Sequence, residues 1–453
     1  MSAIAAIATP DAPGGISVIR ISGEDALKIA SLIFKGAGDK SPEEMEGYTC
    51  AYGYVTDGDE RIDDAVLTVF RAPKSYTGEN CAEISCHGGR YITKKILRLI
   101  LKKGAVLAGP GEFTKRAFLN GKMSLTQAEA VMDVISSSGE RELRYANAVR
   151  EGAVFRRINA IKEKIIKILG DLAAWADFPE EDIPEVSPEA LGKELDEVLT
   201  LFRKTAETYD YGRILREGIN TVIAGKPNVG KSTLMNCLSG FQRSIVTDIA
   251  GTTRDVVEES VKLGDITLRL SDTAGIRETE DVIESIGVDI AYKKIDEAEL
   301  ILAVFDNTVP LEKKDYELID YIRDRKTIAV INKSDGKTLI NKEYIKENFK
   351  HMVEISALND SGINELEDCL EDMFLKEETE ADAGIIANER QMECLESAMQ
   401  NAKEAKNALE NGELLDAITV LLDSAASKLM ELTGESASET VINNVFSRFC
   451  VGK

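Results

Sequence analysis

The sequence predicts a protein with both α/β and all-α domains: an N-terminal α/β domain, a discontinuous helical domain, and a second α/β domain inserted into the helical one. With 453 residues, the chain is long enough for about three domains. Strand and helix patterns alternate over residues 1–118 and again over 219–376, whereas 119–218 and 377–453 have helical periodicity. Because the helical segments flank the second α/β segment, we expect them to form one domain interrupted by an insertion.

The composition is typical of a soluble globular protein, with 30% charged and 43% hydrophobic residues. No apolar stretch approaches the roughly 20 residues of a membrane span, and no basic segment at the N-terminus suggests a signal peptide. The seven cysteines include no C-x-x-C pair, which predicts reduced thiols in a cytoplasmic protein. Cys81, Cys86 and His87 could belong to a metal site, but no second pair completes it, so we interpret them as ordinary core or loop residues.

The net charge of −24 argues against broad nucleic-acid binding, which requires a positive surface. Any contact with RNA must therefore be local, or shared with a more basic partner.

In the N-terminal domain, residues 16–21 alternate like a strand, and Ser22 to Asp25 predict the cap of a helix that runs to about Phe34. Apolar residues at helical spacing predict a further helix over 90–103. The glycine-rich pieces 10–15 and 87–89 are interpreted as turns. Further strands are predicted at 50–55, 65–70 and 82–85.

In the helical segments, Ser124 and Gln127 form a capping-box pattern, and a long amphipathic helix is predicted over 139–168. Residues 178–184 contain two prolines and an acidic run that break the pattern. The acidic stretch 377–382 is interpreted as a solvated linker. A further helix is predicted at 188–209, helical periodicity at 388–432, and a short helix at 438–448.

A phosphate-binding loop is predicted at residues 225–232, which have the spacing G-x4-G-K-S after an apolar strand and before a helix. Gly225 and Gly230 allow backbone N–H groups to converge on phosphate oxygens. Lys231 would reach the outer phosphates, and the Ser232 hydroxyl would be a Mg²⁺ ligand. The alternative is a glycine turn that binds nothing, but the strand–loop–helix setting argues against it.

Four later segments resemble the remaining signatures of a Ras-like GTPase domain, in the order of that family. In residues 248–255, which resemble the first switch loop, Thr253 would complete the Mg²⁺ shell. In residues 271–275, Asp272 would reach the metal through water, and the N–H of Gly275 would meet the γ-phosphate. Asp335, in the sequence Asn-Lys-Ser-Asp, can accept hydrogen bonds from two N–H groups of guanine that adenine lacks, so the motif predicts GTP rather than ATP.

The last of the four segments is Ser356-Ala357, which follows a predicted strand and resembles the final loop that contacts the base. The resemblance implies the following nucleotide-binding residues: Asn228, Val229, Gly230, Lys231, Ser232, Thr233, Thr247, Asp248, Ile249, Ala250, Gly251, Thr252, Thr253, Asp272, Thr273, Ala274, Gly275, Asn332, Lys333, Asp335, Ser356 and Ala357.

The order of the domains and the terminal segment 449–453, with its Cys-x-Gly-Lys ending, resemble the tRNA-uridine modification GTPases called MnmE or TrmE. The resemblance implies an N-terminal domain that dimerises and binds tetrahydrofolate, in the 5-formyl or methylene form, through Arg20, Glu83, Lys122 and Lys453. It also implies an FAD-dependent partner protein that forms a heterotetramer with the dimer. Together they would install an aminomethyl or carboxymethylaminomethyl group at C5 of the wobble uridine of certain tRNAs. Cys450 would take part in this chemistry as a thiolate.

One position departs from Ras-type GTPases: Ile276 stands where they place a water-orienting glutamine. The family resemblance implies two replacements. The first is K⁺, held by the Asn228 side chain and by the positions Thr247, Ile249 and Thr252. The second is Glu284, acting through water; the alternative for Glu284 is a solvated helix carboxylate, because its neighbours are also acidic.

Two other functions are compatible with these motifs. A ribosome-assembly or translation GTPase would carry a basic RNA-binding appendage, and the sequence offers none. A folate-binding regulatory module that merely carries a GTPase would have no need for a reactive cysteine near residue 450.

Overall fold

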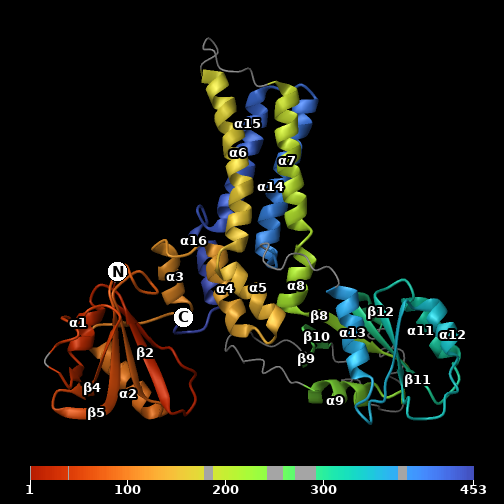
Figure 1. Cartoon of the computed structure of the whole chain (residues 1–453), viewed down its shortest axis with the longest axis horizontal. Coiled ribbons are helices and arrows are strands. Elements are labelled where there is room, and N and C mark those ends of the chain that lie inside the picture. Colours follow the sequence, from red (N-terminus) through yellow and green to blue (C-terminus); the bar gives the residue numbers. More distant parts are fainter. Residues whose placement is uncertain (1, 39, 178–186, 242–258, 271–291, 376–384) are drawn as a thin grey trace. The chain divides into compact units, whose positions relative to one another are not determined.

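The computed structural model describes residues 2–38, 40–177, 187–241, 259–270, 292–375 and 385–453 (Figure 1). Contacts between Cα atoms divide the chain into two compact units. The first contains Met1–Met132, Val149–Val198 and Ser397–Lys453, and the second contains Asp133–Ala148 and Leu199–Glu396. These units group the helices differently from the four predicted segments, whose boundaries stay a prediction.

The N-terminal part of the first unit is built on a seven-stranded sheet with the order β3-β4-β5-β6-β2-β1-β7. Its neighbouring strands are antiparallel, except that β1 and β7 are parallel. The strands are β1 (Ile4–Ile7), β2 (Ile16–Ser22), β3 (Phe34–Gly36), β4 (Thr49–Asp57), β5 (Glu60–Phe70), β6 (Cys81–His87) and β7 (Val106–Leu107).

Helices α1 (Ala26–Ser31) and α2 (Arg90–Lys102) cover this sheet, because alternate strand residues and one face of each helix are apolar. Ile96 and Ile100 of α2 are fully buried in this core. The predicted helix from Ser22 to Phe34 is wrong at its end, since α1 stops at Ser31 and the buried Phe34 begins β3. Pairing with β4 in the sheet overrides the helical pattern there.

The helical part of the first unit joins segments that are far apart in the sequence. Helix α6 (Ala153–Asp177) packs against α15 (Leu415–Thr433), and Lys162 donates to both carboxylate oxygens of Glu435 at 2.7 and 2.8 Å. Near the C-terminus, the buried Phe446 and Phe449 pack with Leu125. The other helices that lie wholly or partly in this unit are α3 (Glu112–Leu119), α4 (Leu125–Ser136), α7 (Pro188–Ala206), α14 (Glu389–Glu410) and α16 (Glu439–Ser447).

The two long segments with predicted helical periodicity are each divided at a glycine with positive φ. The pattern over 139–168 is divided into α5 (Glu140–Arg150) and α6, with Gly152 at φ 90°. The pattern over 388–432 is divided into α14 and α15, with Gly412 at φ 69°. A left-handed glycine ends a helix, so an apolar period that runs across it indicates two helices on one face.

The second unit contains a six-stranded sheet with the order β13-β12-β11-β8-β10-β9, parallel except for the pair β9 and β10. Every residue of β11 and β12 is buried, as expected for a parallel sheet covered on both faces. The strands are β8 (Ile219–Ala224), β9 (Glu259–Leu263), β10 (Ile266–Leu270), β11 (Leu300–Asp306), β12 (Thr327–Asn332) and β13 (His351–Glu354). The described helices that lie wholly in this unit are α8 (Tyr209–Glu217), α9 (Lys231–Phe241), α11 (Lys313–Ile322), α12 (Lys342–Asn348) and α13 (Ile363–Phe374), and most of α5 also belongs to it.

In an open parallel sheet, ligands bind beyond the carboxyl ends of the strands. The predicted phosphate loop follows β8, and the guanine motif begins at the end of β12. The topology therefore brings both motifs to one edge of the sheet. Among the described helices, none has the length and apolar character needed to cross a membrane.

Candidate nucleotide and C-terminal sites

The loop between β8 and α9 has the backbone geometry that its glycines predict. Gly225 has φ 149°, and a Cβ there would lie 2.4 Å from the carbonyl oxygen of Val304. Gly230 has φ 98°, and its Cβ would lie 2.2 Å from Nδ2 of Asn332. A larger residue at Gly225 would therefore displace the backbone of β11, and one at Gly230 would displace the side-chain amide of Asn332. Asn228 also has positive φ, 65°, and its side chain is exposed at the tip of the loop.

Lys231 lies inside this loop. Its Nζ donates to the carbonyl oxygens of Gly225 at 2.7 Å and Lys226 at 2.8 Å. Burial lowers the pKa of the Lys231 ammonium. A bound phosphate would give this ammonium an anionic partner in place of the two neutral carbonyls. Ser232 and Thr233, in the first turn of α9, are exposed. The Ser232 hydroxyl is therefore accessible to a phosphate-bound cation, and the helix N-terminus is accessible to the phosphate itself.

Asn332 joins the phosphate loop to the base-reading loops. Its side chain is buried; Nδ2 donates to the carbonyl of Val229 at 2.9 Å, while Oδ1 accepts from the N–H groups of Lys333 and Ala357 at 2.8 and 3.1 Å. Lys333 Nζ in turn donates to the carbonyl of Asn228 at 2.9 Å. One asparagine therefore fixes three loops that come from three different strands.

Asp335 is exposed and is held by Ser356, whose hydroxyl donates to Asp335 Oδ1 at 2.5 Å. This contact orients the carboxylate and leaves Oδ2 available for a base. The predicted nucleotide-binding residues that the structure describes thus converge on one edge of the sheet. The following lie outside the described residues: Thr247, Asp248, Ile249, Ala250, Gly251, Thr252, Thr253, Asp272, Thr273, Ala274, Gly275 and Glu284.

Asp306, at the end of β11, belongs to this site but is not part of any of the predicted motifs. It accepts from Lys333 Nζ at 2.5 Å and from the backbone N–H and hydroxyl of Thr308. Burial opposes ionisation of Asp306, but the bonds from Lys333 and Thr308 outweigh it, so the pKa of Asp306 is lowered. A carboxylate directly after an apolar run between the two motif strands is the signal that could have identified it.

A second group of predicted residues meets in the N-terminal domain. Arg20 of β2 and Glu83 of β6 are register partners, and Arg20 Nε donates to Glu83 Oε1 at 2.8 Å. The Arg20 guanidinium also lies 5.6 Å from the ring centres of Tyr76 and Phe113. Neither aromatic residue is predicted from the sequence; they form an apolar wall beside a charged pair.

The terminal segment lies against this pair. The carbonyl of Gly452 accepts from Arg20 Nη1 at 3.3 Å, and the carbonyl of Lys453 accepts from the N–H of Phe113 at 3.2 Å. Burial, followed by the charge of Arg20, lowers the pKa of the Lys453 ammonium. Cys450 is exposed, and its carbonyl accepts from the N–H of Gly111 at 3.3 Å.

Lys122 lies apart from this group. Its exposed ammonium donates to the carbonyl of Pro73 at 3.0 Å. Within the described ranges, no contact joins Lys122 to Arg20, Glu83 or Lys453. A ligand that contacts both Lys122 and the Arg20–Glu83 pair would have to extend across the surface between them.

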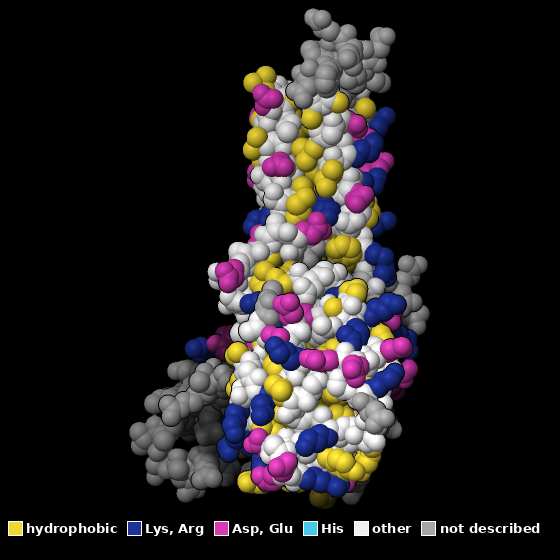
Figure 2. Space-filling model, turned by 90° about the vertical axis from the view of Figure 1, so that its left-hand side faces the viewer, with side chains coloured by type: hydrophobic (Ala, Val, Ile, Leu, Met, Phe, Trp, Pro, Cys, Tyr) yellow, Lys and Arg dark blue, Asp and Glu magenta, His cyan; other side chains and the backbone are white. Residues whose placement is uncertain are grey.

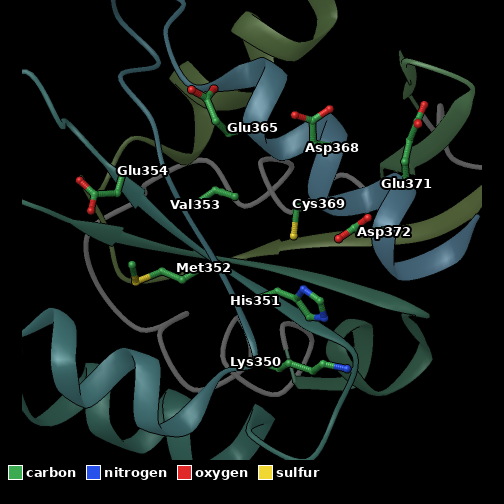
Figure 3. Close-up of a pocket in the computed structure, with 10 residues that line it drawn as sticks. All are labelled: Lys350, His351, Met352, Val353, Glu354, Glu365, Asp368, Cys369, Glu371 and Asp372. Carbon is green, nitrogen blue, oxygen red and sulfur yellow. The ribbon is translucent and has the colours of Figure 1, made fainter. Parts of the chain in front are cut away.

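A cavity of about 700 Å³ lies between β13 and α13, and none of the predicted site residues lines it (Figure 3). Carboxylates dominate its lining, which excludes it as a phosphate site. It is lined by Lys350, His351, Met352, Val353, Glu354, Glu365, Asp368, Cys369, Glu371 and Asp372. In the described part of the chain, no cluster of His, Cys, Asp and Glu could hold a metal ion, and Cys81 and Cys86 are buried thiols.

Comparisons with known proteins cover the whole chain. The family described as "GTP-binding protein TrmE N-terminus" matches residues 3–122, and the "MnmE helical domain" matches residues 125–450. The tRNA modification GTPase MnmE of Carboxydothermus hydrogenoformans is 43% identical over 456 residues, which is 99% of both chains. The chain belongs to the MnmE family. The MnmE of Clostridioides difficile is 42% identical over 455 residues, again 99% of both chains.

Membership of the MnmE family confirms the family predicted from the sequence. It also confirms the fold class, with a TrmE-type α/β N-terminal domain, a discontinuous helical domain and an inserted Ras-like G domain. Among solved structures, an Aquifex aeolicus Era variant bound to GDP.AlF4- is 30% identical over 40% of this chain and 66% of its own, with a TM-score of 0.27. So low a TM-score supports no argument, and the family assignment depends on the sequence matches.

Proposed function

We propose that this protein hydrolyses GTP in the course of tRNA modification. The observation that carries the proposal is Asn332, whose side chain binds the phosphate loop on one side and the base-reading loop on the other. A glycine turn without a ligand would need no such connection. The matched relatives are named tRNA modification GTPases, which supplies the process in which hydrolysis takes part.

In the nucleotide site, Lys231 would exchange its two carbonyl partners for phosphate oxygens, and Asp335 would accept hydrogen bonds from guanine. Ser232, exposed in the first turn of α9, would hold Mg²⁺ together with Thr253. When bound, Mg²⁺ supplies charge to the outer phosphates. Glu284 would orient the attacking water in place of the glutamine that Ile276 replaces.

We further propose that hydrolysis depends on K⁺. Asn228 lies at the exposed tip of the phosphate loop, where its side-chain oxygen is accessible to a cation. It would share the ion with Thr247, Ile249 and Thr252. The proposal predicts that K⁺ accelerates GTP turnover more than Na⁺ does, and that Asn228→Ala removes this acceleration while nucleotide affinity is kept. Equal stimulation of the wild type and the variant by K⁺ would contradict the role of Asn228.

The Arg20–Glu83 group is the proposed tetrahydrofolate site. Glu83 would accept from the N–H edge of the pterin, Tyr76 and Phe113 would cover its ring, and Lys453 and Lys122 would meet the carboxylates of the tail. When bound, the folate supplies a one-carbon unit. The exposed Cys450 thiol would add, as thiolate, to the uracil ring and activate C5. The chain would act as a homodimer with an FAD-dependent partner protein, in the cytoplasm.

For the folate site, the informative variant is Glu83→Gln, which keeps the volume of the side chain and removes its charge. We expect at least a tenfold weaker affinity for 5-formyltetrahydrofolate by calorimetry, with unchanged GTP turnover. Glu60→Gln, on the exposed end of β5 in the same domain, is the matched control. Equal folate affinity in all three proteins would refute the assignment.

The tRNA step is tested by the wobble uridines of tRNA from cells that lack the protein. Loss of the C5 substituent, restored by the wild-type gene, is the expected result. Normal modification of these uridines in the strain that lacks the protein would instead leave a ribosome-assembly GTPase or a folate-regulated GTPase as the better explanation.

A further inference from the structure

Helix α2 carries the most one-sided charge in the N-terminal domain. Its 13 residues, RYITKKILRLILK, include five Lys or Arg and no Asp or Glu, and Lys103 follows directly. This contrasts with the chain as a whole, whose net charge is −24. On the face that Figure 2 shows, Lys and Arg side chains are likewise numerous over the lower part, beside carboxylates. The acidic excess is therefore not uniform, and a local positive surface exists.

The cations of α2 lie on one face. Arg90, Lys94, Arg98 and Lys102 are spaced four residues apart, which places them in one row along a helix. From the first to the last, the row extends about 18 Å, at 1.5 Å per residue. The opposite face, with Ile96 and Ile100, is buried against the sheet. The row thus lies on a rigid support and faces solvent.

The surface is also hollowed. A shallow cavity of about 290 Å³ is lined by Arg90, Tyr91, Lys94, Lys95 and Arg98 alone. Four of these five residues are cationic, and the fifth is Tyr91, which is 77% exposed. An exposed aromatic ring among cations can stack on a base or sugar while the cations contact phosphates.

The carboxylates near this face do not neutralise it. Asp11 pairs with Arg90 and Lys94. Glu60 pairs with Lys95, and Asp57 pairs with Lys102. All of these contacts are at least partly exposed to solvent. Exposed pairs of this kind are weak and exchange readily with other anions. Within the part of the chain that the structure describes, Arg98 forms no ion pair, so its charge is available.

We infer that the exposed face of α2 binds the phosphate backbone of tRNA. This inference rests on the proposed function, since it is the tRNA substrate that makes a polyanion the expected ligand. The row of cations is opposite in charge to a chain of phosphates and is long enough to contact several of them. It therefore explains how an acidic protein can contact RNA. An anionic membrane is the poorer match, because adsorbed helices insert an apolar face, and that of α2 is already buried.

The test compares the full-length protein with Lys94→Glu/Arg98→Glu, using a tRNA transcript and fluorescence anisotropy over a range of KCl concentrations. We expect at least tenfold weaker binding near 100 mM KCl. The slope of log K against log salt should fall by about 1.5, because each phosphate contact contributes about 0.7 to 0.9. Arg98→Lys, which keeps the charge, should bind like the wild type.

The matched control is Lys293→Glu/Lys313→Glu, which changes the net charge by the same amount at two lysines that are 77% and 91% exposed. Its tRNA affinity should fall by less than threefold. Equal GTP turnover in all proteins verifies the fold, and Lys94→Ala/Arg98→Ala replaces the glutamate variant if that one misfolds.

Three outcomes would overturn the inference. If the wild type binds tRNA and the α2 variant binds it equally well, the surface is wrong while the proposed function stands. If the wild type does not bind tRNA at all, the tRNA part of the proposed function fails, and the inference with it. If vesicles containing phosphatidylserine bind the wild type more tightly than tRNA does, and the variant loses that binding, α2 is a membrane surface.

Discussion

At the scale of single residues, the seven cysteines differ sharply in their surroundings. Cys50 and Cys450 are exposed, whereas Cys86 and Cys237 are buried. Burial, followed by the charge of Asp63, raises the pKa of the Cys86 thiol to about 11. Burial, followed by the hydrogen bond with Asp360, raises that of Cys237 to about 12. Only the thiolate reacts with alkylating agents, so a raised pKa suppresses labelling until the pH approaches it.

We therefore predict that iodoacetamide at pH 8 modifies Cys50 and Cys450 of the native protein within minutes and leaves Cys86 and Cys237 unmodified. Raising the pH towards 11 should increase labelling of Cys86, since its thiolate fraction rises. Peptide mass spectrometry measures each site. Equal labelling of all four at pH 8 would contradict the burial of Cys86 and Cys237, and unfolding in urea provides the fully labelled control.

Some residues of the nucleotide site and of the Arg20–Glu83 group can be predicted from the sequence, and others cannot. Asn332 and Lys231 are found by spacing, because the phosphate loop and the guanine motif are local patterns. The partnership of Arg20 with Glu83 depends on the register between β2 and β6, which no local pattern encodes. Tyr76 and Phe113 are missed for the same reason: they reach Arg20 only through the tertiary fold.

At the scale of elements, the ends of helices depend on glycines whose conformation the sequence does not state. Gly434 caps α15 with φ 93°, and a Cβ there would lie 2.6 Å from Cβ of Leu125 in α4. Gly412, after α14, has φ 69°, but nothing lies within 4 Å of its Cβ position. The two glycines thus share a backbone requirement and differ in packing.

This difference yields a matched prediction. Gly412→Ala should cost about 1 kcal/mol, for the left-handed conformation alone. Gly434→Ala should cost a further 1 to 3 kcal/mol, because α4 and α15 must move apart. Thermal unfolding followed by circular dichroism should show the larger decrease in melting temperature for Gly434→Ala. Equal decreases would mean that the contact between Gly434 and Leu125 is looser than the structure indicates.

In the second unit, strands are predicted where a nucleotide motif follows them and missed where none does, whereas in the N-terminal domain β2, β4, β5 and β6 are predicted from their residue patterns alone. β8 and β13 are found because each leads into a nucleotide motif. β11 is missed, although it is apolar from Leu300 to Phe305, since a short apolar run also fits a buried helix. β3 and β7 have three and two residues, too few for any period to be recognised.

At the scale of the whole molecule, the helical domain is closed by contacts between residues on either side of the G domain. Lys162 has a side chain that is only 9% exposed, and its carboxylate partner Glu435 lies 273 residues later in the chain. Lys164, on the same helix, pairs with Glu197 where both side chains are exposed. The first pair joins the two parts of the domain, whereas the second lies on its surface.

We predict that Lys162→Ala lowers the free energy of unfolding by about 1 to 2 kcal/mol, a value that allows for the partial exposure of Glu435. Lys164→Ala should change it by less than about 0.5 kcal/mol. Urea unfolding monitored by helical circular dichroism compares the two variants. A larger effect from Lys164→Ala would mean that the domain is not held together at Glu435.

The packing of α6 against α15 also has a consequence for synthesis. A ribosome that adds about 5 to 20 residues per second needs roughly 14 to 55 s to pass from Lys162 to Glu435. During that interval the apolar side of α6 has no α15 to cover it, whereas the last strand of the intervening G domain, β13, is complete at Glu354, before α15 is made. The nascent chain is therefore expected to depend on chaperones most strongly in this interval, and slower translation would increase aggregation.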